Sequence, residues 1–221
     1  MSEVLDQLRE EFERLAEEAQ TLTFLPRGTE LQEQACARIE GFLGVLAATK
    51  VACVQSLDEV GANTVLDLEL SLEVVRAELN MWLDLKRDAP EAAWDSLVSA
   101  QDLCENAIQV RRQVGGDSSG LENLSMKLLL IEQMVFPPQA FNSVGGIADR
   151  RECSVCGGDY ETCDHIKGRA YMGQVCHTRL FLREVREVSI VTDPANKRCR
   201  ITHFSDQGKM RNKMTWRLED R

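Results

Sequence analysis

The sequence predicts a mainly α protein, in which a five-helix, antiparallel bundle-like body is followed by a small C-terminal module and a β-hairpin. Along residues 1–149, apolar residues recur at spacings of three and four, which is typical of helices with one buried face. Beyond this point, the segment from Cys153 to Cys199 contains five of the eight cysteines of the chain. We therefore expect a helical body and a cysteine-rich module of a different kind.

Length and composition limit the possible classes of protein. The chain has 221 residues, enough for one large domain or for one domain and a small module. Apolar residues make up 43% and charged residues 28%, a balance that excludes general disorder and fibrous repeats. No apolar run approaches the length of a membrane span, and residues 1–6 lack the basic start and apolar stretch of a signal peptide. We expect a cytoplasmic protein that does not associate with membranes.

The net charge of −10 is divided unevenly along the chain. Residues 1–149 carry 11 Lys and Arg against 26 Asp and Glu, whereas residues 150–221 carry 15 against 10. This shift predicts three parts: an acidic all-α body over 1–149, a basic cysteine module with a hairpin over 150–205, and a basic tail over 206–221.

The first helix is predicted by an apolar stripe that lies opposite a glutamate-rich side. The stripe consists of Leu5, Leu8, Phe12, Leu15, Ala19 and Leu22. Pro26 and Gly28 mark the end of this helix. A stripe of this kind usually packs in a core, but its regular spacing also allows an exposed seam for self-association or for a partner helix.

A second helix is predicted to begin at Thr29, where Thr29 and Gln32 form a capping-box pattern, and to run to about Leu57. Gly41 and Gly44 lie within its broad apolar arc. Because glycine lets another helix approach closely, we expect this helix to be the central one.

The next segment is ambiguous. Leu66–Val74 alternates as a half-buried strand would, but the apolar positions that continue to Trp82 fit only a helix. We therefore interpret this segment as a third helix.

Two further helices have clear start signals. Asp88 as a cap and Pro90 in the first turn predict the start of a fourth helix, which ends at Gly115–Gly116. Ser119 and Glu122 form another capping-box pattern, which opens a short fifth helix.

The main functional signal is a cluster of metal-ligand residues at the start of the basic part. Cys153-Ser-Val-Cys156-Gly is a Cys-x-x-Cys turn followed by glycine, which is typical of a zinc knuckle. Cys163 and His165 can supply the other two ligands and complete a Cys₃His site. In a cytoplasmic chain, such a cluster indicates metal rather than disulfides. The sequence therefore predicts a structural Zn²⁺ site.

The ligand set has one alternative. Cys176 could replace Cys163 or His165 through a longer loop. His177 follows Cys176 directly, and we expect it at the surface or beside the ligands rather than bound to the metal.

A β-hairpin or a pair of short strands is predicted after the cysteine cluster. Val185–Val191 is rich in β-branched residues, Asp193–Asn196 has the composition of a turn, and Cys199–Phe204 is a second short strand. Because a two-stranded ribbon is not stable alone, zinc and the helical body must hold it in place.

The segment around the cysteines resembles one in phage prohead-protease-like proteins and in small uncharacterised bacterial proteins. The likeness covers about residues 152–204 and rests on the spacing of Cys153, Cys156, Cys163, His165, Gly168, Tyr171, Gly173 and Cys176, followed by Glu187–Val191 and Pro194–Asn196. It implies metal binding at the cysteines and at His165, and by association a place in a bacterial phage-defence system. It does not imply proteolysis, because the residues before the cysteines are predicted to be helical.

We expect a non-enzymatic zinc-binding subunit or adaptor in protein assembly, whose helical body binds a protein partner or a second copy. His165, His177 and His203 all lie outside the body, which also lacks a glycine-rich phosphate loop. One alternative is nucleic-acid binding through the basic zinc module. A third possibility is a metal-dependent or prohead-protease-related hydrolase, which requires an open coordination position or chemistry by His177 and His203.

Overall fold

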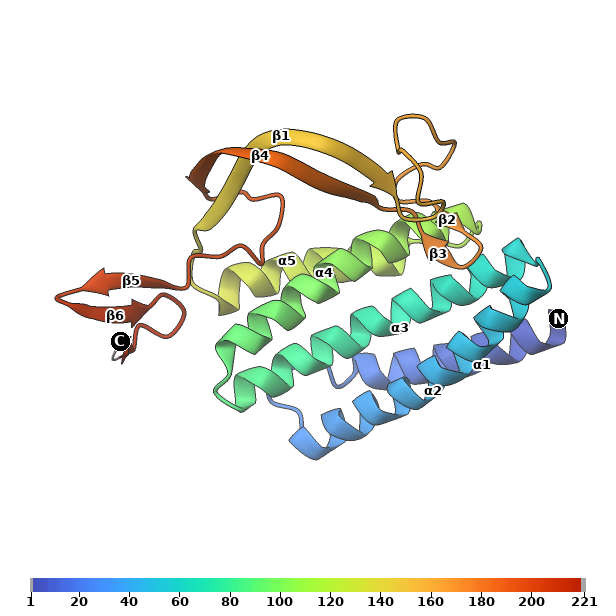
Figure 1. Ribbon diagram of the computed structural model, residues 1–221. Helices are drawn as coiled ribbons and strands as arrows, with labels where there is room; N and C mark the ends of the chain where they lie inside the picture. The colour runs from blue at the N-terminus through green and yellow to red at the C-terminus, as the bar shows by residue number, and fades with distance from the viewer. Residues whose placement is uncertain (1, 220–221) are drawn as a thin grey trace.

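The computed structural model describes residues 2–219, and it confirms the mainly α fold with a C-terminal β region. Five helices run up and down and are joined by short loops, as Figure 1 shows. Their bounds are α1 Ser2–Gln20, α2 Thr29–Gln55, α3 Glu59–Lys86, α4 Pro90–Gln113 and α5 Ser119–Val135. None of the helices described is both long and apolar enough to cross a membrane.

The central helix is α3, which is buried on almost every side. Leu72 and Leu79 pack with α1 and α2, whereas Val74 and Met81 pack with α4 and α5. This two-sided burial explains why Leu66–Val74 alternates like a strand although it is helical, as we predicted.

The prediction that the second helix is central is wrong. α2 lies at the edge of the body in Figure 1, and Gly41 and Gly44 are exposed, with no atom within 4 Å of the place that a Cβ atom would take. The two glycines therefore do not allow a close helix–helix approach within this chain.

The apolar stripe of α1 packs in the core. Leu8, Leu15 and Ala19 are buried against α2 and α3, and Phe12 is partly buried beside them. The exposed-seam alternative for this helix is therefore wrong.

The helix starts agree with the prediction within a residue or two, but the predicted caps do not form. Gln32 does not bond back to Thr29; its amide instead donates to two carbonyl oxygens of the loop between α1 and α2. Before α5, it is the Ser118 hydroxyl that hydrogen-bonds to Glu122, at 2.5 Å. Ala89 rather than Asp88 precedes α4 as its cap residue.

A long two-stranded ribbon follows the helices. β1 (Phe141–Cys153) pairs antiparallel with β4 (Thr178–Val191), and Figure 1 shows the pair as an arch above α4 and α5. Val185–Val191 is a strand as predicted, but its predicted pairing with Cys199–Phe204 is wrong. β1 also begins inside the range 1–149 that we predicted to be all-α.

The two ends of the ribbon are buried, whereas its middle is exposed. Phe141 is buried beside Trp94 of α4, with ring centroids 6.1 Å apart. At the other end, Cys153 is buried in the cysteine cluster. Between these ends, β4 is exposed on both faces. The ribbon therefore depends on its two anchors.

Gly146 allows the close approach of β1 to β4. A Cβ atom at this position would overlap the backbone carbonyl oxygen of Glu184. We expect Gly146→Ala to loosen the ribbon by about 1–3 kcal/mol, because a backbone atom cannot move aside cheaply. Hydrogen exchange in β1 and β4 should become faster.

Gly120→Ala in α5 is the matched control, because that site is open and alanine favours helix. Unchanged exchange in the ribbon of the Gly146→Ala variant would contradict the predicted overlap.

The C-terminal segment is folded against the body. β5 (His203–Asp206), β6 (Lys209–Asn212) and β7 (Leu218–Glu219) form a three-stranded sheet. Met214 is buried in the main core, and Arg217 forms an ion pair with Asp88. The described part of the predicted basic tail, up to residue 219, is therefore folded and packed against the body.

Candidate metal centre

The loop between β1 and β4 begins with a tight knuckle. The amide of Val155 donates to Cys153 Sγ at 3.4 Å, and the amide of Gly157 donates to the carbonyl oxygen of Cys153 at 2.9 Å. Gly157 has a φ of 70°, which glycine adopts without strain. The Cys-x-x-Cys-Gly pattern thus forms the turn that it predicts.

The four predicted ligands meet at this knuckle. The ligand atoms of Cys153, Cys156, Cys163 and His165 all lie within 4.8 Å of one another. In a tetrahedral site, a Zn–S distance of about 2.3 Å places two sulfurs about 3.8 Å apart. The cluster therefore has donors of the right kind and spacing to hold a metal ion.

The surroundings of His165 fit a metal ligand. Its Nδ1 is buried and has no hydrogen-bond partner within residues 2–219. Buried polar atoms are almost always paired, so an unpaired ring nitrogen in a residue beside three thiols fits the role of a metal ligand. The Tyr171 ring packs edge-on against the imidazole, with centroids 4.7 Å apart, and holds its plane.

Two tyrosines organise the loop that carries His165, and of the two only Tyr171 belongs to the pattern on which the sequence resemblance rests. The Tyr171 hydroxyl accepts from the amide of Ile166 at 2.9 Å, and the Tyr160 hydroxyl accepts from the amide of Lys167 at 3.0 Å. Both bonds satisfy amides immediately after His165, so they set the path of the backbone at this ligand.

Cys176 is a further thiol at the same centre. It is buried, and its Sγ lies 3.7 Å from Cys153 Sγ, close to the separation of two sulfurs on one zinc ion. The structure gathers the predicted Cys₃His set and keeps Cys176 beside it. Replacement of a ligand by Cys176 stays a prediction.

The thiols differ in how readily they ionise. Burial alone would raise the pKa of Cys153, but the amides of Cys156 and Val155 and the neighbouring thiols lower this pKa to about 6. Burial raises the pKa of Cys163, and burial together with the nearby thiols raises the pKa of Cys176 to about 11. Because a metal binds thiolates, its binding at this cluster must release protons from the high-pKa thiols that it ligates.

The cysteine module is docked on the helices through a small hairpin, β2 (Ala170–Tyr171) and β3 (Gln174–Val175). Gln113 of α4 donates to the carbonyl oxygen of Ala170 and accepts from its amide, both at 2.8 Å. Asn63 of α3 accepts from the amide of Gly173 at 2.8 Å. These two amide side chains seat the module, although neither stood out in the sequence.

Part of the basic charge after residue 150 is paired with the acidic body. Four ion pairs join the two parts: Lys197 with Glu132, Arg198 with Asp102, Arg200 with Glu91, and Arg217 with Asp88. The opposite charges of the two parts therefore serve partly to hold them together.

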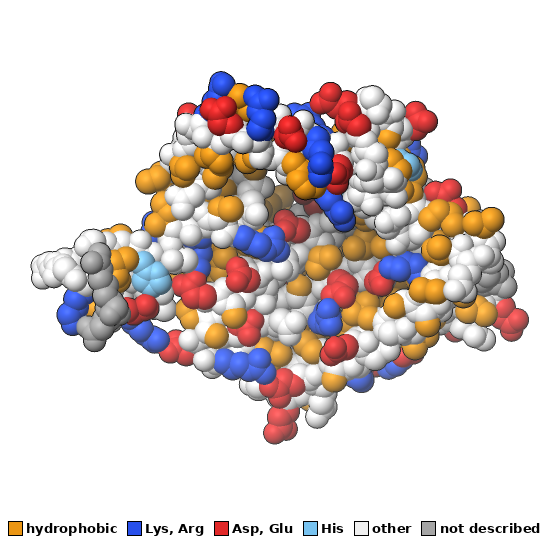
Figure 2. Space-filling view, in the orientation of Figure 1, with side chains coloured by type: hydrophobic (Ala, Val, Ile, Leu, Met, Phe, Trp, Pro, Cys, Tyr) orange, Lys and Arg blue, Asp and Glu red, His pale blue; other side chains and the backbone are white. Residues whose placement is uncertain are grey.

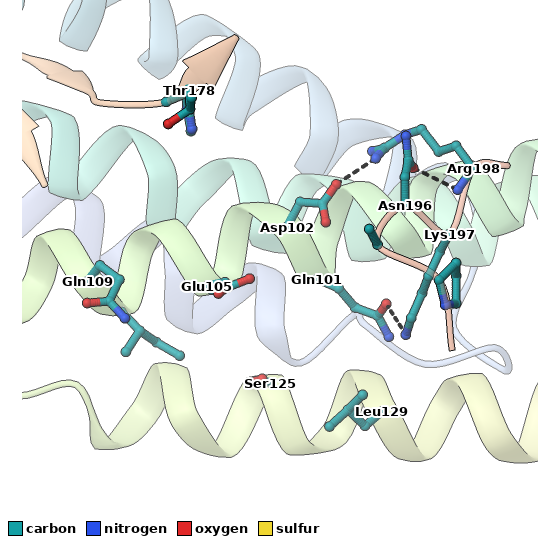
Figure 3. A pocket seen from close by; sticks show the side chains of 14 residues that line it. Gln101, Asp102, Glu105, Gln109, Ser125, Leu129, Thr178, Asn196, Lys197 and Arg198 are labelled. Carbon is teal, nitrogen blue, oxygen red and sulfur yellow. Dashed lines mark hydrogen bonds and ion pairs between the residues drawn. The ribbon is translucent and has the colours of Figure 1, made fainter. Parts of the chain in front are cut away.

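A cleft of about 870 Å³ lies between α4, α5, the base of β4 and residues 194–198, and Figure 2 shows the surface hollowed below the ribbon. Figure 3 shows its polar lining, in which Arg198 is paired with Asp102 at 2.5 Å. His177 and Ser125 also line the cleft, but no hydrogen bond joins these two side chains in the described part of the chain. These two residues therefore do not form a base-and-nucleophile pair.

The structure does not bring His177 and His203 together. His177 precedes β4 at the cysteine end of the ribbon, whereas β5, which contains His203, lies beyond the opposite end (Figure 1). The His203 ring hydrogen-bonds to Thr202 and Glu219. The two histidines therefore cannot act on one substrate group.

The mainly α body with a Cys₃His cluster at the root of a β-ribbon defines the chain as a helical protein with a candidate metal centre. Comparison with known proteins found no matching family model, curated protein or solved structure.

Proposed function

We propose that this chain is a non-enzymatic zinc-binding subunit that acts in protein assembly. The observation that carries the proposal is the position of the four donors, which lie where β1 ends and the return to β4 begins. Four protein donors fill a tetrahedral zinc site and leave no position for a reactive water. In this place, zinc fixes the ribbon and the module on the body, and the closed donor set argues against the hydrolase alternative.

The surface proposed for a protein partner is the outer side of α5. We call it the α5 face; it consists of the exposed apolar residues Met126, Leu130 and Met134. Met134 is 83% exposed, which is unusual for a methionine in a folded helix. Exposed apolar faces that contain methionine are common at protein-binding surfaces, because methionine adapts to different partners.

The test is purification of the tagged chain from its native host, with zinc quantification and identification of the proteins recovered. We expect about one zinc ion per chain and a protein partner that is lost with Leu130→Asp. Val60→Asp is the matched control, because Val60 is also an exposed apolar helix residue but lies on α3. A chain without zinc and without any partner would contradict the proposal, and equal recovery with both variants would exclude the α5 face.

Proteins of a phage-defence system among those recovered would support the setting that the sequence resemblance implies. Their absence would remove that setting and leave the assembly role to be judged on its own partner.

Nucleic-acid binding is the second candidate function. Within the predicted basic module, residues 150–205, four basic residues form no ion pair with any described residue: Lys167, Arg169, Arg179 and Arg183. If these side chains contact phosphates, the logarithm of the affinity should fall with the logarithm of salt by about 0.9 per contact. An affinity for DNA or RNA that does not change with salt would exclude this function.

A further inference from the structure

Two buried thiols of the cysteine cluster lie in contact across the end of the ribbon. Cys153 is the last residue of β1, and Cys176 lies two residues before β4 begins. Their Sγ atoms are 3.7 Å apart, and the two residues are 1% and 0% exposed. Because four donors complete a tetrahedral zinc site, Cys176 is a fifth donor beside the Cys₃His set.

Hydrogen bonds between their chain neighbours hold these two thiols together. The amide of Ser154 donates to the carbonyl oxygen of His177 at 2.9 Å, and the Ser154 hydroxyl accepts from the amide of His177 at 2.8 Å. The same hydroxyl donates to the carbonyl oxygen of Val175 at 3.4 Å. Ser154 directly follows Cys153, whereas Val175 and His177 flank Cys176. These bonds fix the two segments that carry the thiols, and none of them uses a metal-ligand atom.

The two cysteines have the placement that a disulfide needs. A disulfide joins cysteines on adjacent segments whose sulfurs can approach to about 2.05 Å. Cys153 pairs with Thr178 in the ladder, which places Cys176 on the adjacent segment, and the two Sγ atoms are already in van der Waals contact. Inside cells, disulfides are usually transient, and many of them sense oxidants.

We infer that Cys153 and Cys176 form a reversible disulfide in the presence of hydrogen peroxide, and that this disulfide controls the zinc site. Once Cys153 is in the disulfide, only two thiols and one imidazole of the Cys₃His set are left for the metal. The inference adds regulation to the proposed function, and the part that concerns zinc release rests on that function.

The oxidant reaches the buried pair through Cys156, which is exposed and belongs to the same cluster. The Cys156 thiolate attacks hydrogen peroxide: an S–O bond forms, the O–O bond breaks, and the hydroxide that leaves takes up a proton to give water. The Cys153 thiolate then attacks the Cys156 sulfur, so that an S–S bond forms and a second hydroxide leaves and becomes water.

Thiol–disulfide exchange completes the reaction. The Cys176 thiolate attacks the Cys153 sulfur, which moves the S–S bond to the buried pair and frees Cys156 as a thiolate. In total, two thiols lose two electrons and two protons, and one hydrogen peroxide molecule becomes two water molecules.

The disulfide keeps the ribbon closed while the metal site opens. It joins the end of β1 to the segment before β4, so the ribbon retains an anchor at its cysteine end. The loop that carries the other three donors is then no longer held at a common ion. The oxidised chain should therefore combine slow amide exchange in β1 and β4 with faster exchange at residues 156–165.

The test treats the purified, zinc-loaded chain with hydrogen peroxide, blocks the remaining thiols and digests the chain with trypsin without reduction. The first three cysteines of the cluster fall on the tryptic peptide 152–167, and Cys176 falls on the peptide 170–179. We expect mass spectrometry to find these two peptides joined, with Cys153 as the linked residue on fragmentation. A colorimetric chelator should record the loss of zinc, and reduction followed by added zinc should restore binding.

Variants check the role of the buried pair. After peroxide treatment, Cys176→Ser should show fast amide exchange in the ribbon, because no disulfide closes its end. Cys199→Ser is the matched control and should keep both the link and the slow exchange, since Cys199 is exposed and lies outside the cluster.

Several results would overturn the inference: a link from Cys176 to Cys156 or Cys163, a link only within the peptide 152–167, oxygen added to single cysteines without any link, or no reaction. The metal-free chain, treated in the same way, should also form the link. A chain that binds zinc but never forms the link would contradict the disulfide alone, whereas a chain that forms the link but never binds zinc would contradict the proposed function.

Discussion

Loss of the proposed zinc site is expected to release the ribbon while the five helices stay folded. Cys163→Ser should abolish stoichiometric zinc binding, because it leaves two thiols and one imidazole of the Cys₃His set. The ribbon then loses its anchor at the cysteine end, and a two-stranded ribbon that is exposed on both faces has little stability of its own. Amide exchange in β1 and β4 should become faster by orders of magnitude, as the large binding free energy of structural zinc implies.

The helical signal in circular dichroism should change little in the same variant, because the cores around α3 do not include the cysteine cluster. Cys199→Ser is the control, since Cys199 is exposed and lies outside the cluster. If the ribbon kept its slow exchange without zinc, the metal would have no structural role. If Cys163→Ser still bound one zinc ion tightly, Cys176 would be its ligand.

The helices could be predicted from the sequence because their apolar spacing reflects burial within each helix. The position of each helix within the body could not be predicted in the same way. Gly41 and Gly44 have the pattern of a close helix contact, but only the packing of the other helices decides whether a neighbour is present. α3 is ambiguous in sequence for the opposite reason, since burial on both sides removes the polar face that would identify a helix.

The pairing of β4 with β1 could not be predicted from the sequence, for a different physical reason. β1 contains Gly145, Gly146 and a run of charged residues, so it lacks the β-branched composition that marks Val185–Val191 as a strand. Cys199–Phe204 lies closer in sequence, which made a local hairpin the simpler prediction. The true pairing spans the entire cysteine loop, a distance that local patterns do not encode.

The candidate metal site was predicted more completely than the fold around it. Cys153, Cys156, Cys163 and His165 are metal-ligand residues within one short loop. Their spacing alone allows them to meet around one ion, so the prediction depends little on how distant parts of the chain pack. The supporting side chains were missed because they are distant in sequence. Asn63 and Gln113 lie on helices more than fifty residues away from the hairpin they contact and are chemically ordinary, so only the folded chain reveals that they hold the module.

Lys127→Met should cause a large loss of stability in the helical body. Glu78 is 1% exposed, and its carboxylate is compensated by the Lys127 ammonium 2.6 Å away. Lys127 also donates to the Thr23 hydroxyl at 2.8 Å, which ties α5 to the loop after α1. Loss of the Lys127 ammonium leaves the buried carboxylate of Glu78 without its counterion. The free energy of unfolding at neutral pH, measured with a denaturant, should fall by about 3–5 kcal/mol.

The cost should depend on pH in a defined direction. Burial raises the pKa of Glu78 above its ordinary value of 4.5, although Lys127, Trp82 and Thr23 oppose the rise. Because the pKa of Glu78 is raised on folding, this group stabilises the folded chain at pH values below the ordinary pKa. That stabilisation is lost as the pH rises through the pKa of the folded state. Removal of the ammonium raises this pKa further, so the loss caused by Lys127→Met should be largest at neutral pH and should shrink as the pH falls toward 4.5.

A double variant distinguishes the effect of the unpaired Glu78 charge from the effect of losing the packing contacts of the Lys127 side chain. Glu78→Gln combined with Lys127→Met removes both charges, so it should recover much of the lost stability and should no longer show this pH dependence. Arg112→Met is the surface control, because the pair of Arg112 with Glu122 is about half exposed and should contribute no more than about 1 kcal/mol. If Lys127→Met and Arg112→Met had similar effects, the contact between Lys127 and Glu78 would not stabilise the packing of α5 on α3.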